Sequence, residues 1–421
     1  MYGVGGIVAP FPGIWLIDQV LAEPNIMIHT GAEVVGAKGY VGNYNVTIRQ
    51  QPRGVRGTFP TEQEAIAACP VKHRREFDYG LSTRKAIYRA YTGCVPESLV
   101  IDWEHCTKCG ECVNLAPEGM IDLDEEAQEF NIDVGAVVIA TGFQPYEPFY
   151  GEMGWKEFPE VITLAQLHRL LDEEGPSEGK FFWNGHPVRN VAIIHCVGSR
   201  QIEGVHRAQP DGNVNNYCSR VCCTASLSMA SLIRQKAPDA KIYEVYEDIR
   251  TYGRGHEDYY TRASANNVTF LRYFAEEIPE VKRADEKSKN PLLVKVRDHL
   301  TWGEEIEIPV DLVVLATGMM PNPVQDLIEI FKVTPGSGKT LNTILANALY
   351  GNWSFGYALA LVTILSEGAL LFVAAQAGYI DGPRIMANMA IDSWLPHRFA
   401  SLSERLTMHN GVLLMGGASI L

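Results

Sequence analysis

The segment from Cys196 to Cys223 constrains the fold of this chain more than any other stretch. Four of the nine cysteines of the 421-residue sequence lie in it: Cys196, Cys218, Cys222 and Cys223. The apolar run 191–195 before it is typical of a buried parallel strand. Residues 225–236 after it carry apolar side chains at near-helical spacing. The sequence therefore predicts a strand-to-helix connection in a doubly wound α/β sheet, where such sheets bind ligands.

The residues of this connection favour metal ligation over phosphate binding. A dinucleotide-binding fold carries a Gly-x-Gly-x-x-Gly turn here, whereas this chain keeps Gly198, has Cys196 and lacks the rest of that fingerprint. The N-terminus lacks the pattern of a secretory signal peptide, so we expect reduced thiols, and clustered reduced cysteines indicate metal. The adjacent pair Cys222 and Cys223 is unusual for a zinc ribbon. We therefore expect a 4Fe–4S cluster, with zinc or inert buried cysteine as the alternatives.

A second group of cysteines follows the Cys-x2-Cys-x2-Cys spacing of bacterial ferredoxins. In two-cluster ferredoxins the last cysteine of one motif binds the other cluster, which makes Cys69 the candidate fourth ligand. One complete 4Fe–4S site is then predicted at Cys69, Cys106, Cys109 and Cys112. The ligand positions of the other cluster are Phe59, Glu62, Ala65 and Ala116, none of which is cysteine. One site is thus lost as a unit and the other is complete; a zinc knuckle is the alternative.

Two apolar runs, 134–139 and 310–315, each end in Ala-Thr-Gly. Small residues at the C-terminal end of a buried strand allow the backbone to approach a dinucleotide closely. We therefore predict a cofactor site lined by Ala140, Thr141, Gly142, Ala316, Thr317 and Gly318, with two ordinary strand ends as the alternative. Further strands are expected at 26–29, 44–48, 241–246 and 268–273, and helices at 162–171 and 255–266.

The length predicts two or three domains, and the net charge of −14 argues against a nucleic-acid partner. No residue stands out as a general acid, base or nucleophile, so no catalytic residue is predicted. Three histidines, His195, His206 and His256, are candidate ligands, although each is more often a structural or solvated residue.

Several of these motifs together carry a family resemblance. They are Lys85–Tyr88, Val100–Asp102, Cys106–Cys112, Ala140–Phe143, Cys196–Arg200 and Tyr217–Cys223. With them, residues from about 25 to about 330 resemble the heterodisulfide reductase A family. The resemblance implies a thioredoxin-reductase-like doubly wound flavoprotein fold with an inserted ferredoxin-like module. Residues 1–57 would be part of an FAD-binding region, 58–130 the 4Fe–4S module, and 131–333 a pyridine-nucleotide-oxidoreductase-like domain with the cysteine-rich cluster site.

The same resemblance implies an electron-transferring iron–sulfur flavoprotein that belongs to an oxidoreductase complex. Electrons would pass between FAD, two 4Fe–4S clusters and other heterodisulfide-reductase-type subunits, with ferredoxin or hydrogenase-type electron donors. It implies that the cysteines between Cys196 and Cys223 bind a cluster beside the flavin, and that Ala140–Gly142 and Thr317–Gly318 line the flavin site. Residues 1–333 would be cytoplasmic.

The composition changes after about residue 335. Residues 341–380 contain one charged residue, Glu367, and 353–380 is long enough to span a bilayer. Residues 336–421 resemble part of an amino-acid-permease (APC-type) transporter through Gly338–Asn342, Gly382–Arg384, Asp392–Pro396 and Met408–Gly411. We therefore expect a C-terminal α-helical membrane-type segment with a membrane contact through 353–380. The alternative function is a permease-type transporter fragment fused to a non-functional redox remnant.

Overall fold

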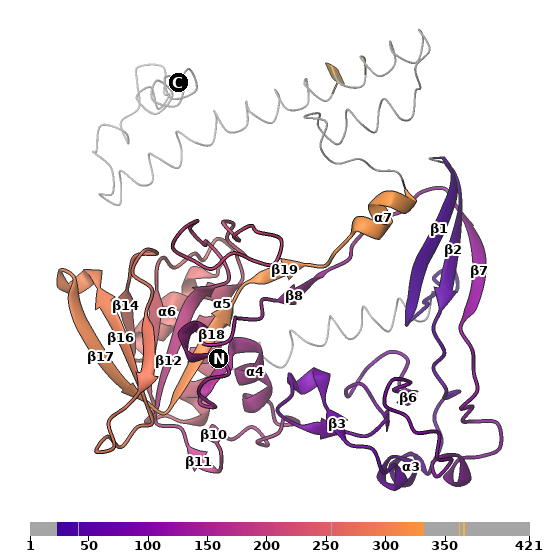
Figure 1. Cartoon of the computed structure of the whole chain (residues 1–421), viewed down its shortest axis with the longest axis horizontal. Helices are drawn as coiled ribbons and strands as arrows, with labels where there is room; N and C mark the ends of the chain where they lie inside the picture. Colours follow the sequence, from indigo (N-terminus) through magenta and orange to yellow (C-terminus); the bar gives the residue numbers. More distant parts are fainter. Residues whose placement is uncertain (1–22, 41, 254, 332–361, 363–364, 367–421) are drawn as a thin grey trace, which may run out of the picture. The chain divides into compact units, whose positions relative to one another are not determined.

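The computed structural model of this α/β protein describes residues 23–40, 42–253 and 255–331, together with Val362 and 365–366 (Figure 1). The chain divides into two compact units. The first contains the described parts of Met1–Val34, Ile48–Phe130 and Val138–Val324. The second contains those of Val35–Thr47, Asn131–Val137 and Gln325–Leu421.

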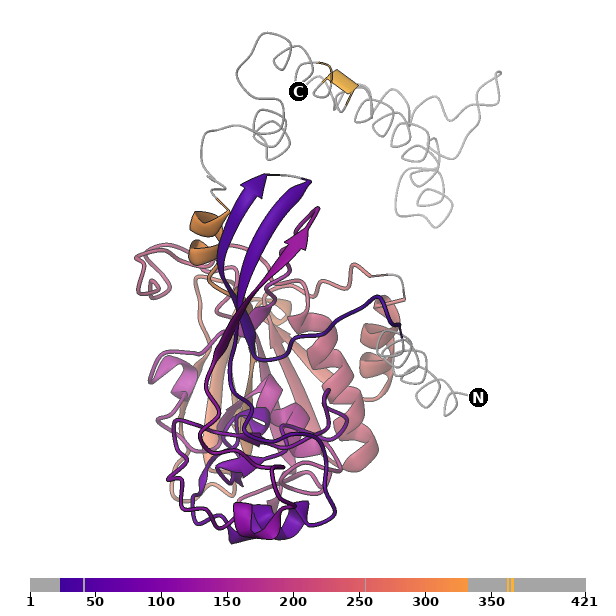
Figure 2. The same ribbon diagram turned by 90° about the vertical axis from the view of Figure 1, so that its right-hand side faces the viewer.

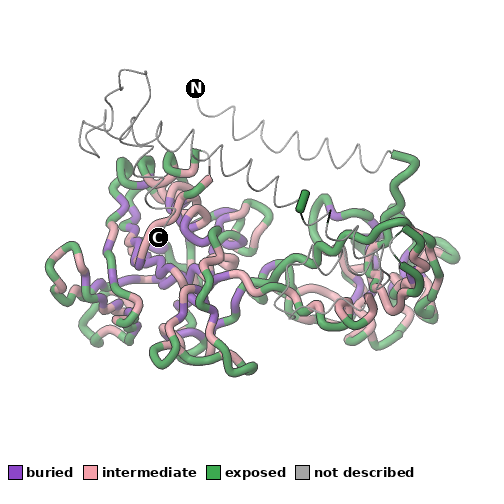
Figure 3. The backbone as a smooth tube through the Cα atoms, turned by 90° about the horizontal axis from the view of Figure 1, so that it is seen from above, coloured by how far each residue is buried: buried purple, intermediate pink, exposed green. Residues whose placement is uncertain are grey.

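A five-stranded parallel sheet with the strand order β14-β13-β12-β18-β9 forms the centre of the first unit (Figure 1). Its strands are β9 (Val161–Thr163), β12 (Asn190–Val197), β13 (Lys241–Tyr246), β14 (Val268–Arg272) and β18 (Leu312–Thr317). Buried residues, purple in Figure 3, follow these strands. Strands covered on both faces read as continuous apolar runs, which is why 191–195 and the run before Ala316 were predicted correctly.

Alternate residues of the central strand pack on opposite faces of the sheet. On one face, Val191 and Ile193 share a core with the helices α4 (Leu164–Leu171), α5 (Cys222–Lys236) and α6 (Glu257–Ala265). On the other face, Ala192 and Ile194 pack in a core with an antiparallel sheet of β15 (Glu280–Arg283), β16 (Leu292–Asp298) and β17 (Glu304–Val310). Both layers hold β12 firmly, so the position of its C-terminal end is well defined.

The predicted helices are confirmed with shifted ends. α4 begins at Leu164 because residues 161–163 form β9 and Thr163 caps the helix. Its side chain accepts from the Gln166 backbone N–H at 3.3 Å, and the Gln166 side chain accepts from the Thr163 N–H at 2.9 Å. α5 begins at Cys222 and therefore includes both adjacent cysteines. α6, β13 and β14 lie at the predicted places.

Residues 51–127 form a small module with little regular structure, which we call the cysteine module. Its elements are α3 (Glu62–Ala68), the antiparallel pair β3 (His73–Arg74) and β4 (Thr83–Arg84), and the antiparallel pair β5 (Ile87–Tyr88) and β6 (Val100–Ile101). Its core is separate from that of the parallel sheet, and Cys69 and Cys112 are buried in it beside Ile87 and Leu99. Metal-ligand candidates are thus core residues of this module.

A three-stranded sheet with the order β1-β2-β7 consists of β1 (Ala32–Tyr40), β2 (Asn43–Gln50) and β7 (Gln128–Val134), seen side by side in Figure 2. The Thr47 hydroxyl donates to the Asn131 side chain at 2.7 Å. The predicted strand at 44–48 is confirmed within β2. The predicted strand at 26–29 is wrong: these residues are irregular and largely exposed, and no strand of the described chain pairs with them.

The predicted buried strand at 134–140 is also wrong. β7 ends at Val134, and residues 136–142 are irregular and exposed, with Val138 90% exposed. Regular structure resumes at β8 (Phe143–Pro145), which pairs antiparallel with β19 (Met319–Pro321). A β-branched run forms a buried strand only where a neighbouring strand and a covering layer exist, and the described residues supply neither here. The remaining elements are β10 (Phe182–Trp183), β11 (His186–Pro187) and α7 (Gln325–Ile330).

Candidate metal centres

Four cysteines of the cysteine module line one small cavity: Cys69, Cys106, Cys109 and Cys112. Its other walls are mainly apolar and include Ala86, Ile87, Ile101 and Leu123. Cys69 directly follows α3, and the other three lie in the loop after β6. The structure therefore brings together, from two separate segments, the four residues that the sequence assigned to one site. We call this site the four-cysteine cavity.

The loop of this cavity bends through two left-handed residues, Lys108 at φ 51° and Gly110 at φ 80°. The bend points the Lys108 N–H at the sulfur of Cys106, 3.5 Å away. Burial raises the pKa of the Cys112 thiol, and the charge of Cys106 adds to this effect. Thiolates crowded into an apolar cavity need a cation to offset their repulsion, so the donor set fits a bound metal centre.

The spacing of the sulfur atoms distinguishes zinc from an iron–sulfur cluster. A tetrahedral zinc bonded to thiolates at about 2.3 Å holds their sulfurs about 3.8 Å apart. Although all eight cysteines of the two sets are described, no three of their sulfurs lie within 4.8 Å of one another. In a 4Fe–4S cluster each thiolate binds a different iron, so the sulfurs stand further apart. The observed spacing therefore fits a cluster better than it fits zinc.

Other side chains fill the positions where a second ferredoxin-type cluster would have its ligands. Phe59 and Ala65 are buried in the core of the cysteine module, and Ala116 packs against that core. The Glu62 carboxylate accepts the Phe59 N–H at 3.2 Å and forms an ion pair with Arg89. These positions now contribute packing and an ion pair to the module.

The other four cysteines gather where β12 leads toward α5, and we call them the strand-end cysteines. Cys196 lies near the end of β12 at φ 60°, Cys218 in the following loop, and Cys222 and Cys223 at the start of α5. Burial raises the pKa of Cys222 to about 12, and the charges of Cys223 and Cys218 add to this. Burial, with Glu247 and Cys223 nearby, also raises the pKa of Cys196. Each thiol thus senses others of the set.

Backbone and hydroxyl groups hold the loop of Cys218 against the ends of two strands. The Arg200 N–H donates to the Tyr217 carbonyl at 2.9 Å. The Met319 N–H donates to the Ser219 hydroxyl at 2.8 Å. Since both neighbours of Cys218 are fixed, the loop presents its thiol in a defined place without help from regular secondary structure.

Gly198 has a role that the sequence did not reveal. Its φ is 73°, and a Cβ at this position would overlap the ring of Tyr146. Tyr146 is 2% exposed, and its hydroxyl donates to Glu152 at 2.9 Å. Glycine is therefore required so that a buried aromatic ring can pack against the turn after Cys196.

The candidate histidines have structural partners. His195 is fully buried, and its Nε2 lies 2.5 Å from the Glu244 carboxylate. Burial alone would lower the pKa of His195, but the Glu244 charge outweighs it and raises the pKa to about 10. His206 accepts the Ile202 N–H at 3.0 Å, and His256 lies 3.4 Å from the Thr224 hydroxyl. Glu244 was not predicted; its signal was a lone carboxylate in the apolar strand 241–246.

The two Ala-Thr-Gly segments have different surroundings. Ala316 is buried, and Thr317 and Gly318 line a groove with Phe143, Val221 and Met319. The carbonyl of Thr317 lies 3.6 Å from the sulfur of Cys222, which places this groove beside the strand-end cysteines. Ala140, Thr141 and Gly142 are exposed and do not line the groove. Their link to the other segment is the Asn322 side chain, which donates to the Thr141 carbonyl at 2.7 Å.

The predicted transporter-like segment 336–421 and the predicted membrane span 353–380 lie outside the described residues, as does the start of the expected FAD-binding region. In the part of the chain that the structure describes, no helix combines the length and apolarity needed to cross a bilayer.

Comparison with known proteins supports the resemblance of the N-terminal three quarters. The chain is 39% identical over 317 residues to the iron–sulfur protein HdrA-type component of the CoB–CoM heterodisulfide reductase of Methanocaldococcus jannaschii, covering 72% of this chain and 45% of that protein. It is 40% identical over 309 residues to one of two corresponding proteins of Methanopyrus kandleri, covering 72% of this chain and 44% of that protein.

A third relative belongs to the H2:CoB–CoM heterodisulfide,ferredoxin reductase of Methanothermobacter marburgensis. It is 33% identical over 332 residues, covering 77% of this chain and 47% of that protein. The chain thus spans less than half the length of these relatives. No protein-family model matches it. These comparisons give no support to the transporter resemblance of residues 336–421.

Proposed function

We propose that this chain is an electron-transferring iron–sulfur subunit of the heterodisulfide reductase A type. The observation that carries the proposal is the four-cysteine cavity, where thiols from two segments converge at a spacing too wide for zinc. The similarity to heterodisulfide reductase proteins of the A type over about 72% of the chain supports it independently.

In this proposal each set of four cysteines holds one 4Fe–4S cluster, which supplies reversible one-electron transfer. The chain's own groups hold and adjust these centres. The Lys108 N–H aims at the sulfur of Cys106, and the fixed loop of Cys218 completes the second set. Donors to ligand sulfurs and the burial of the site both set a cluster's potential. No residue of the chain is proposed as an acid, a base or a nucleophile.

The proposal includes FAD and a thioredoxin-reductase-like arrangement, with residues 58–130 as a ferredoxin-like module and 131–333 as the nucleotide-oxidoreductase-like domain. The groove lined by Thr317, Gly318 and Met319 supports this, because it adjoins Cys222 and its glycine permits close approach to the backbone. A planar aromatic cofactor in this groove would lie beside the strand-end cysteines.

The partners of the chain are proposed from the names of its relatives. The Methanothermobacter marburgensis protein is named for H2, ferredoxin and the CoB–CoM heterodisulfide. A Methanosarcina acetivorans relative, 32% identical over 337 residues, is named for ferredoxin and F420H2. We propose that this chain likewise passes electrons between a ferredoxin- or hydrogenase-type donor and other subunits of a heterodisulfide-reductase-type complex.

The test is metal, sulfide and flavin analysis of the full chain, purified without oxygen. We expect about eight irons per chain, from two four-iron clusters. Cys69→Ala and Cys218→Ala should each lower this to about four, because each removes one ligand of one set. Cys94→Ala is the matched control, since Cys94 is buried but belongs to neither set. Stoichiometric zinc without iron, or unchanged iron in both ligand variants, would sink the proposal.

A further inference from the structure

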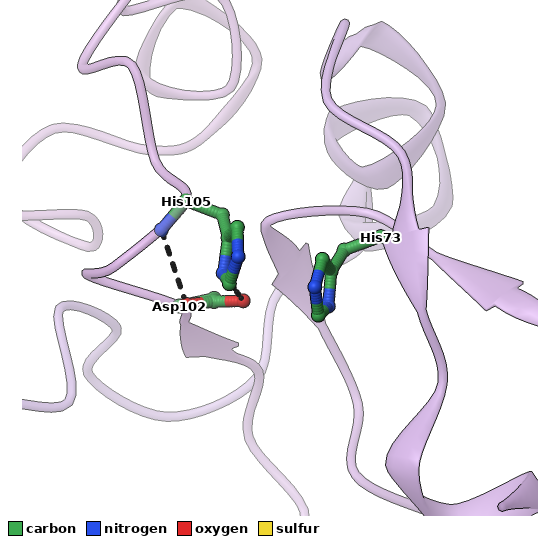
Figure 4. A group of neighbouring side chains, drawn as sticks. All are labelled: His73, Asp102 and His105. Carbon is green, nitrogen blue, oxygen red and sulfur yellow. Dashed lines mark hydrogen bonds and ion pairs between the residues drawn. The ribbon is translucent and has the colours of Figure 1, made fainter. Parts of the chain in front are cut away.

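A second kind of ligand cluster lies in the cysteine module outside the four-cysteine cavity. His73 extends from β3, whereas Asp102 and His105 belong to the loop that follows β6 (Figure 4). One ligand atom from each of the three side chains lies within 4.8 Å of the others. His105 Nδ1 is 2.9 Å from Asp102 Oδ2, and the two imidazole rings stack with centroids 3.8 Å apart. We call this group the His–Asp–His cluster.

The charges around this cluster favour a cation. Arg84 binds Glu76 through two contacts of 2.6 Å and reaches Asp102 at 2.9 Å, so one guanidinium serves two carboxylates. With neutral imidazoles the local charge is therefore −1. The Nδ1 atom of His73 is buried without a hydrogen-bond partner in the described chain, and the Glu76 carboxylate lies 3.6 Å from it. A buried polar atom without a partner is costly unless a ligand satisfies it.

We propose that His73, Asp102 and His105 bind a divalent transition-metal cation of the Zn²⁺ class. Imidazole nitrogen and carboxylate oxygen are ordinary zinc ligands, and three protein ligands with a water in the fourth position form a complete site. Tetrahedral bonds of about 2.0–2.1 Å hold the ligand atoms about 3.3 Å apart. The cluster needs only a small contraction to reach this spacing, with the metal replacing the hydrogen bond between His105 and Asp102.

Access to the site and its separation from the thiols support the assignment. The side chains of His73 and His105 are 36% and 33% exposed, which leaves an entry path for a hydrated ion. The site offers nitrogen and oxygen donors, whereas the four-cysteine cavity offers sulfur, so the two attract metals of different softness.

The bound metal would tie β3 to the loop that presents a cluster ligand. The Cys106 N–H donates to the Asp102 carbonyl at 2.8 Å, so the backbone at Asp102 directly supports Cys106. A metal bridging His73 and Asp102 would restrain that backbone from a second segment. Its role is then to hold the cysteine module together.

The experiment uses the full chain, purified without oxygen with its iron in place. Equilibrium dialysis against Zn²⁺, with zinc and iron measured per chain, should give one zinc without loss of iron. His73→Ala should weaken zinc binding by about tenfold or more, since even loss of an outer-shell partner costs that much. The control is His186→Ala, which removes an exposed histidine of β11 and should leave zinc binding unchanged.

Two further measurements decide the case. X-ray absorption at the zinc edge should show nitrogen and oxygen ligands without sulfur. His73→Gln keeps a polar side chain of similar reach and should also bind zinc weakly, and full iron content in either variant shows that the module has folded. Sulfur ligation of the zinc, or equal binding by His73→Ala and His186→Ala, would overturn the proposal.

Discussion

The two cysteine sites differ in how far the surrounding fold depends on them. In the cysteine module the helix and strands are short, and the ligand candidates Cys69 and Cys112 are themselves members of the small core. The strand-end cysteines lie at the edge of a parallel sheet whose strands β12 and β18 are buried by aliphatic side chains on both faces. A metal centre is thus part of the core in one region and is added to a complete core in the other.

The largest expected effect comes from removing the metal. Chelation under mild oxidation should leave the amide protons of β12, β13 and β18 protected against hydrogen exchange, because their core needs no metal. Amides of residues 51–127 should lose protection together, because binding free energy in a metal-organised module is folding free energy.

Hydrogen exchange read by mass spectrometry, before and after chelation, checks this difference peptide by peptide. The comparison breaks if both regions stay protected, since the cysteine module would then fold without its metal.

Gly198→Val should be the most damaging single change at the strand-end site. It places a side chain into the ring of Tyr146 and adds strain at φ 73°, and we expect a loss of about 3 kcal/mol or more in unfolding free energy. Gly204→Val is the matched control, because Gly204 has φ 81° but no atom within 4 Å of its would-be Cβ.

Denaturant unfolding and iron content measure the two variants. The control variant should keep about eight irons and lose only the strain term, about 1–3 kcal/mol. Equal losses in both would mean that Tyr146 yields and that its packing does not shape the site.

Asp102→Asn tests how the module loop depends on charge. Asp102 and Arg84 are both below 10% side-chain exposure, and removing the carboxylate charge weakens their 2.9 Å ion pair. We expect a loss of about 2 kcal/mol. Asp124→Asn is the control: its ion pair with Lys108 is exposed, and surface pairs contribute about 0–1 kcal/mol. Thermal unfolding of both variants provides the measurement; a larger loss for Asp124→Asn would contradict the expectation.

The smallest effect is expected for Cys94→Ala. Cys94 is 5% exposed, and its sulfur contacts the Pro96 carbonyl at 3.5 Å, away from the residues that line the four-cysteine cavity. Losing one buried sulfur should cost about 1 kcal/mol and no iron. Iron analysis checks this, and a loss of about four irons would show that Cys94 replaces one of the proposed ligands.

Much of the fold was predictable because its strands are local signals. The runs 191–195, 241–246 and 268–272 are apolar over a strand's length and form the parallel sheet as expected. The run 134–140 carries the same kind of signal and ends in the same Ala-Thr-Gly as β18, yet it is exposed and irregular. Whether such a run becomes a strand depends on neighbours distant in the sequence, which a local pattern does not contain.

The candidate sites show the same limit. Spacing and a rule for exchanged ligands were enough to group Cys69 with the cysteines at 106–112, which the structure places around one cavity. The partners of these sites could not be found that way, because Tyr146 meets Gly198, and Glu244 meets His195, only through the tertiary fold.

The directions of two helices bear on how the sites would share electrons. Cys222 and Cys223 occupy the first turn of the 15-residue helix α5, at its positive end, whereas Cys69 follows the last residue of α3, at its negative end. Adding an electron to a metal centre increases its negative charge, which the positive end of a helix dipole stabilises and the negative end opposes. With the proposed clusters in both sites, these fields favour the resting of an electron at the strand-end cysteines, so α3 and α5 bias transfer in one direction.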